Sequence, residues 1–62
     1  MPVSGKELLK EALRAGWIID RQKGSHVTVE QLGRKSVTIP IHGNQDLGKG
    51  LEHKMRKQLG LK

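Results

Sequence analysis

The hydrophobic and polar positions of this chain follow two different periods, and the first is helical. Apolar residues recur at helical spacing near the start: Leu8, Leu9, Ala12 and Leu13. Ser4 and Glu7 stand before them in the arrangement of a capping box, and Gly16 stands where a helix would end. The pattern predicts an amphipathic helix over residues 5–15. Its outward positions carry mixed charges: Lys6, Glu7, Lys10, Glu11 and Arg14.

From residue 17 to residue 41 the period becomes two, which is typical of β-strands. Three strands are expected: residues 17–22, a run containing Val27 and Val29, and a run from Ser36 to Ile41. Lys23-Gly24 is expected to form the first turn and residues 32–35 the second. Pro40 has no N–H to donate, so the third strand should end near it or lie at a sheet edge.

Helical spacing returns in the last part of the chain. Four apolar residues follow at intervals of four: Leu47, Leu51, Met55 and Leu59. They predict a closing helix that Gly60 ends. Its polar side is basic: Lys49, Lys54, Arg56 and Lys57. The expected fold is α+β, a helix, a three-stranded antiparallel sheet and a helix (αβββα) in one domain over residues 1–62. Both helices should cover one face of the sheet and leave the other face open.

Strand parity predicts where two histidines lie. The apolar residues of the second and third strands are all odd-numbered, so odd positions face the helices: Val27, Val29, Val37, Ile39 and Ile41. Opposed residues of an antiparallel pair share a face, so odd positions must pair with odd ones. One suitable register pairs His26 with Pro40, diagonal to His42, and the other pairs His26 directly with His42. Both registers place the two imidazoles on the open face, within reach of each other. Three hydroxyl residues share that face: Thr28, Ser36 and Thr38.

Composition narrows the classes of function. The 12 Lys and Arg residues against 6 Asp and Glu give a net charge of +6, which favours a polyanionic partner, either nucleic acid or an acidic protein. The chain has no cysteine, so it has neither a disulfide nor a thiolate metal site, and an intracellular setting is expected. It shows no membrane-spanning run and no signal-peptide core, so we expect a soluble, cytoplasmic protein.

One segment gathers the groups needed to handle a phosphodiester: Arg21-Gln22-Lys23-Gly24-Ser25-His26. Cations, a turn glycine and a hydroxyl can together cradle a phosphate. An imidazole, with an ordinary pKa of about 6.5, can move a proton at neutral pH. His53 has no such company and is interpreted as a surface residue, and Trp17 is interpreted as a core residue. The three histidines have no acidic cluster beside them, so no metal or cofactor is expected.

The ordered set of short motifs resembles the HicA toxins of bacterial type II toxin–antitoxin systems, also described as YcfA-like mRNA interferases. The matching segments run nearly end to end: Ser4-Gly5-Lys6-Glu7-Leu8, Gly16-Trp17, the segment from Arg21 to His26, Pro40-Ile41-His42 and Leu47-Gly48-Lys49-Gly50. After the last glycine the family often has Thr-Leu, where this chain has Leu51-Glu52.

The resemblance implies a fold like that of a double-stranded-RNA-binding domain and an endoribonuclease activity that cleaves mRNA to arrest translation. It also implies inhibition by a HicB antitoxin and a catalytic role for His26. RNA supplies its own nucleophile, the 2′-OH, so the reaction needs no metal. From the residues we assign phosphate binding to the rest of the motif: Arg21, Lys23, Gly24 and Ser25. His42 is a candidate second proton-transfer or binding group.

Two other classes of function stay open at this point. A non-catalytic RNA-binding module of the same fold would read the shape of a duplex and need no particular histidine. An adaptor would only dock an acidic protein. Both classes predict that His26 can be replaced without loss of function, whereas an endoribonuclease needs it.

Overall fold

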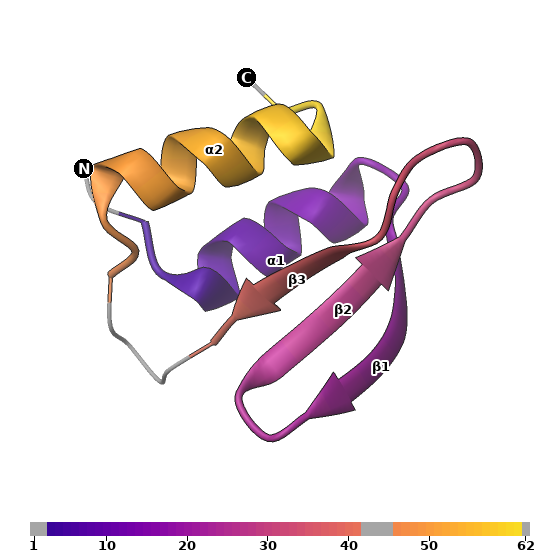
Figure 1. The fold of residues 1–62 in the computed structure, drawn as a ribbon, viewed down its shortest axis with the longest axis horizontal. Coiled ribbons are helices and arrows are strands. Elements are labelled where there is room, and N and C mark those ends of the chain that lie inside the picture. The colour runs from indigo at the N-terminus through magenta and orange to yellow at the C-terminus, as the bar shows by residue number, and fades with distance from the viewer. Residues whose placement is uncertain (1–2, 42–45, 62) are drawn as a thin grey trace.

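Five elements follow one another in the predicted order (Figure 1). The computed structural model describes residues 3–41 and 46–61. The elements are α1 (Gly5–Arg14), β1 (Ile18–Lys23), β2 (His26–Glu30), β3 (Val37–Pro40) and α2 (Lys49–Leu59). The strands form one antiparallel sheet in the order β1-β2-β3. The αβββα prediction is confirmed.

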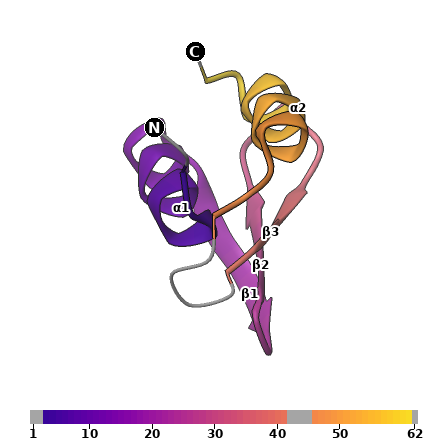
Figure 2. The ribbon, with the colours of Figure 1, turned by 90° about the vertical axis from the view of Figure 1, so that its left-hand side faces the viewer.

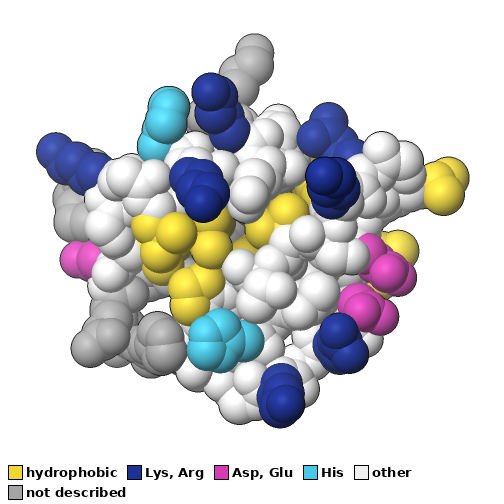
Figure 3. All heavy atoms as spheres, in the orientation of Figure 1, with side chains coloured by type: hydrophobic (Ala, Val, Ile, Leu, Met, Phe, Trp, Pro, Cys, Tyr) yellow, Lys and Arg dark blue, Asp and Glu magenta, His cyan; other side chains and the backbone are white. Residues whose placement is uncertain are grey.

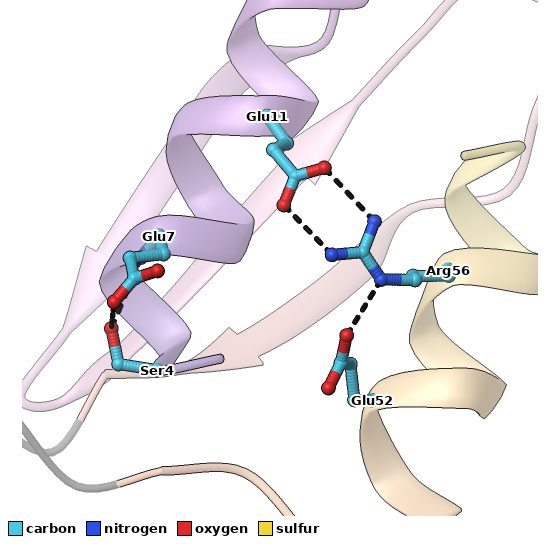
Figure 4. Close-up of polar contacts among 5 residues, drawn as sticks. All are labelled: Ser4, Glu7, Glu11, Glu52 and Arg56. Carbon is cyan, nitrogen blue, oxygen red and sulfur yellow. Dashed lines mark hydrogen bonds and ion pairs between the residues drawn. The ribbon is translucent and has the colours of Figure 1, made fainter. Parts of the chain in front are cut away.

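Helix α1 begins at Gly5, as predicted, and ends at Arg14, one residue before the predicted end. The Glu7 amide donates to the Ser4 hydroxyl at 3.3 Å, and that hydroxyl donates to the Glu7 carboxylate at 3.4 Å (Figure 4). Beyond the other end, Gly16 has a φ of +97°, which glycine adopts at little cost. Gly5, in the first turn, lies so close to the backbone of Pro40 that a Cβ would overlap the Pro40 carbonyl. A glycine therefore lets α1 dock directly on the end of β3.

The core lies between the sheet and the helices. Its buried apolar side chains are Leu8, Ala12, Trp17, Val27, Val29, Val37, Ile39, Leu47, Met55 and Leu59. The sheet contributes the odd-numbered residues of β2 and β3 to this core, as the alternation predicts. Figures 1 and 2 show α1 behind the sheet and α2 beside β3, and both helices contact β3. Neither helix of the described ranges is long and apolar enough to cross a membrane.

Trp17 lies in this core, as predicted. Its side chain is buried, and its indole Nε1–H donates to the carbonyl of Leu59 at 3.1 Å. The last carbonyls of a helix lack partners within the helix, so this bond satisfies one of them. Gly60 follows with a φ of +72° and ends α2, again as predicted.

The first strand and its turn lie one residue later than predicted. Strand β1 begins at Ile18 instead of residue 17, and it runs through Lys23, which pairs with His26. The turn is therefore Gly24-Ser25, not Lys23-Gly24. Gly24 has a φ of +59°, a conformation that suits glycine at the first central position of a two-residue hairpin.

The closing helix departs from the predicted row of four apolar residues. Leu47 is buried, but it lies before α2, and Leu51 is 41% exposed. A step of four residues turns an α-helix by about 400°, so a strict four-residue row drifts around the helix. Within α2, only Met55 and Leu59 of that row reach the core.

An ion-pair network joins the two helices. Arg56 of α2 donates two hydrogen bonds to Glu11 of α1, at 2.8 and 2.9 Å, and one to Glu52 at 2.8 Å (Figure 4). The bonds from Arg56 lower the pKa of the Glu11 carboxyl against the opposing effect of burial. The same bonds, first to Glu11 and then to Glu52, raise the pKa of Arg56. From the sequence we placed Arg56 on the basic polar side of the closing helix. The structure corrects this, because the Arg56 guanidinium links α2 to α1.

Candidate active site

The register of β2 and β3 decides where His26 lies. His26 is opposite Pro40, and Thr28 is opposite Thr38, which is the first of the two registers that parity allowed. Strand β3 ends at Pro40 and lies at the edge of the sheet, as the missing N–H of Pro40 predicts. His26 is exposed on the face that points away from the helices, as predicted. His42 lies outside the described residues, so the proximity of the two histidines stays a prediction.

A bulge in β1 brings two cations onto the face of His26. The pairing of β1 with β2 shifts by one residue between Ile19 and Arg21. After the shift the opposed pairs are Arg21 with Thr28, Gln22 with Val27, and Lys23 with His26. Opposed residues share a face, so Arg21 and Lys23 lie on the open face. Without the extra residue, strand alternation would send both cations to the helix side.

The bulge is the feature that sequence reasoning missed. All six residues of β1 are exposed, so the strand has no buried alternation from which its register could be read. The parity rule could be applied only to β2 and β3. The motif as a whole was found, but the face on which Arg21 and Lys23 lie was not.

The side chains of the open face therefore stand in two rows across the three strands. The first row is Lys23, His26 and Pro40, and the second is Arg21, Thr28 and Thr38. The hydroxyl oxygens of Thr28 and Thr38 are 3.2 Å apart, within hydrogen-bond distance. The rows are two residues apart along each strand, which is about 7 Å.

The turn Gly24-Ser25 closes the hairpin beside the first row. The Ser25 carbonyl accepts a hydrogen bond from the Ile41 N–H at 2.6 Å, which ties the turn to the end of β3. The Gln22 side chain donates to the Gly24 carbonyl at 3.3 Å and braces the turn from β1. The predicted phosphate-binding residues are thus brought together with His26 at one end of the sheet.

The charge at this end of the sheet is positive. The Arg21 side chain is 80% exposed and lies 4.0 Å from the Asp20 carboxylate. Figure 3 shows a histidine at the hairpin end of this face with Lys or Arg side chains beside it. Among residues 3–41 and 46–61, no three His, Asp or Glu side chains are grouped to hold a metal ion. The arrangement offers an anion two cations and an imidazole on one exposed surface.

The fold and the site together define a class of protein: small, basic α+β proteins that carry a histidine and cations on an open sheet face. A family model described as the HicA toxin of bacterial toxin–antitoxin systems matches residues 5–61. The chain therefore belongs to the HicA toxin family, which confirms the resemblance found in the sequence.

The chain is also similar to a curated protein named "Probable mRNA interferase HicA" from Pseudomonas fluorescens (strain Pf0-1). The two are 50% identical over 40 residues, which is 64% of this chain and 65% of that protein. The aligned part thus falls just short of two thirds of the relative's length. No solved structure matches the chain.

Proposed function

We propose that this protein is an endoribonuclease toxin that cleaves mRNA at the hairpin end of its open sheet face, with His26 as the acid–base group. Its family and the name of its relative, an mRNA interferase, support the class of reaction. The observation that carries the assignment is the register: His26 shares one exposed face with Lys23 and Arg21. Because mRNA is the substrate, the protein acts in the bacterial cytoplasm.

The reaction uses the nucleophile that RNA already holds. The 2′ oxygen forms a bond to the neighbouring phosphorus while the bond from phosphorus to the 5′ oxygen breaks. His26 accepts the 2′-OH proton, and the leaving 5′ oxygen takes a proton from water or from His42. The products carry a 2′,3′-cyclic phosphate and a 5′-hydroxyl.

The turn and the two cations act on the phosphate. Lys23, directly opposite His26, and Arg21 stabilise the negative charge that builds up on the phosphorane oxygens. The backbone amide of Gly24 and the hydroxyl of Ser25 orient the phosphate at the turn.

The proposal includes no metal ion. Metal-dependent cleavage with Mg²⁺ uses carboxylates as ligands. Two of the chain's carboxylates, those of Glu11 and Glu52, hydrogen-bond with Arg56 between the helices, and the Glu7 carboxylate accepts from Ser4. The proposed proton transfer instead uses only the imidazole of His26.

Cleavage of unstructured RNA in EDTA tests this function. We expect His26→Ala to slow cleavage at least about 100-fold and to change the free energy of unfolding by no more than about 0.5 kcal/mol, as for ordinary surface sites. His53→Ala, which removes an exposed imidazole from α2, is the matched control and should cleave normally. Mass spectrometry should find a cyclic phosphate or its 3′-phosphate hydrolysis product.

Each part of the proposal has its own contrary result. Cleavage by His26→Ala at the wild-type rate would remove His26 from the mechanism. A 5′-phosphate product, or loss of activity in EDTA, would instead show a metal-dependent reaction. Tight RNA binding by a wild-type protein that cleaves nothing would favour the non-catalytic RNA-binding module.

We also propose that an acidic HicB-type antitoxin inhibits the protein by covering the open face. A net charge of +6 attracts an acidic partner over long range, so the association rate should fall as salt is added. The affinity should depend less on salt, because exposed ion pairs contribute little and an apolar contact carries the binding. Ile18, exposed opposite Glu30, offers such a contact on the same face.

Stopped-flow association at increasing ionic strength and hydrogen exchange of the complex test this partner. An association rate that ignores salt would contradict electrostatic attraction. Protection from exchange that spares the β1–β2 hairpin would contradict direct cover of His26.

A further inference from the structure

The Thr28–Thr38 pair is a polar feature of the open face that the proposed function does not use. The two residues are directly opposed on β2 and β3, and their hydroxyl oxygens are 3.2 Å apart. Thr38 is exposed and Thr28 is half-buried. β-branched side chains are stiff at χ1, and both residues have their backbones fixed in strands. The two hydroxyls therefore form a polar site whose geometry is set before a ligand binds.

We propose that this pair reads the 2′-OH of a ribose next to the one whose 2′-OH is the nucleophile, an inference that rests on the proposed function. A hydroxyl offers one donor and two acceptor positions. The bond between Thr28 and Thr38 uses one donor and one acceptor, so the pair can still donate and accept at once. A ribose 2′-OH also does both, whereas a phosphate oxygen only accepts.

The position of the pair points to a neighbouring sugar. The Thr28–Thr38 row lies about 7 Å from the His26 row along the strands. A group bound by the threonines is therefore distinct from the phosphate held at Lys23 and His26. Arg21 lies opposite Thr28 in the same row, so a cation assigned to the phosphorane also adjoins the ribose site.

The aromatic content of the chain supports recognition through the backbone of RNA. Trp17 is its one residue of the Phe, Trp and Tyr types. It is 2% exposed, with its Nε1–H bonded to Leu59. Proteins that bind single strands usually stack bases on exposed aromatic rings. Binding here depends instead on contacts with sugars and phosphates. The substrate class is RNA, which the protein distinguishes from DNA by the 2′-OH groups of individual riboses, with little dependence on base identity.

Isosteric variants and a modified substrate test this inference. Thr28→Val/Thr38→Val keeps the shape of the pair and removes both hydroxyls, while Thr28→Ser/Thr38→Ser keeps the hydroxyls. Ser36→Ala removes an exposed hydroxyl just before β3 and is the matched control. The substrates are one RNA oligonucleotide with a mapped cleavage site and two copies of it. Each copy keeps the nucleophilic 2′-OH and carries 2′-fluoro at the nucleotide just before or just after the one that supplies the nucleophile.

Loss of one hydrogen-bonding group should slow the wild-type enzyme about tenfold on one of the two 2′-fluoro substrates. The double Val variant should cleave RNA about tenfold more slowly and be indifferent to that fluorine. The double Ser variant and Ser36→Ala should discriminate like the wild type. Thr38→Val alone, at the more exposed position, carries the same expectation if the double variant does not fold.

Two outcomes overturn the inference: a wild type that ignores both fluorines, or a double Val variant that discriminates as the wild type does. Either result, with His26→Ala inactive, removes the ribose contact and leaves the proposed function standing. Activity of His26→Ala removes the proposed function itself.

Discussion

Two arginines of this protein show how differently the same residue type can be used in two regions. Arg56 lies between the helices, is 18% exposed and donates three hydrogen bonds to Glu11 and Glu52. Arg21 lies at the hairpin end of the sheet, is 80% exposed, and forms an ion pair of 4.0 Å with Asp20. The first holds the fold together, and the second presents its charge to solvent.

The difference shows that the net charge of the chain does not tell which cations are available to bind an anion. The charge of Arg56 is balanced by the two carboxylates that it contacts, so it adds little to the field at the open face. The cations of β1 are placed by a bulge on the face of His26, where an anion can reach them. We expect variants in the two regions to separate function from stability.

The largest effect is expected from Arg21→Ala/Lys23→Ala. Removal of groups that stabilise charge in a transition state should slow cleavage about 100-fold, while the free energy of unfolding changes by no more than about 0.5 kcal/mol. Lys54→Ala/Lys57→Ala, which removes two exposed cations from α2, is the control for net charge. Equal losses in both variants would show that only total charge matters.

Gly5→Ala tests the link between the two regions, because Gly5 docks α1 on Pro40, the strand neighbour of His26. The added methyl group must push the helix from the Pro40 carbonyl, as in an overpacked core. We expect a loss of about 2 kcal/mol in the free energy of unfolding, measured in urea. Stability equal to wild type would show that this close approach is dispensable.

Arg56→Met should have the opposite signature to the β1 variant. It leaves Glu11 and Glu52 without their hydrogen bonds, so the free energy of unfolding should fall by about 1 kcal/mol, allowing for solvent screening. Cleavage measured well below the unfolding temperature should stay at the wild-type rate. A large loss of cleavage in a folded Arg56→Met protein would break the contrast between the two arginines.

The smallest expected effect is a change in the free energy of unfolding as the pH is lowered into the acid range. The pKa of Glu11 is lowered from 4.5, so its pair with Arg56 stabilises the fold above about pH 4.5 and loses this contribution as pH falls through the lowered pKa. Glu11 is 39% exposed, so the contribution should be below about 1 kcal/mol. The gap in unfolding free energy between wild type and Glu11→Gln should shrink from about pH 7 to about pH 3. A gap that is constant with pH would contradict this.

Local patterns in the sequence predicted most of the fold because each depends on neighbouring residues. The Ser4 cap, the glycines at positions 16 and 60 and the alternation of β2 and β3 all appear in the structure as expected. The error at Leu51 has a local cause too, since a four-residue spacing was taken for a straight stripe. Glu52 and Arg56, four apart on a helix, carried a readable signal for their ion pair.

The sequence by itself determined the order of the elements and the face on which His26 lies, because the period of buried valines and isoleucines sets strand parity. Tertiary structure alone decided the rest. The bulge before Arg21 depends on how β1 pairs with β2, and the partner of Arg56 on the other helix is 45 residues away. Both depend on contacts between segments that become neighbours only when the chain folds, and no local pattern encodes such contacts.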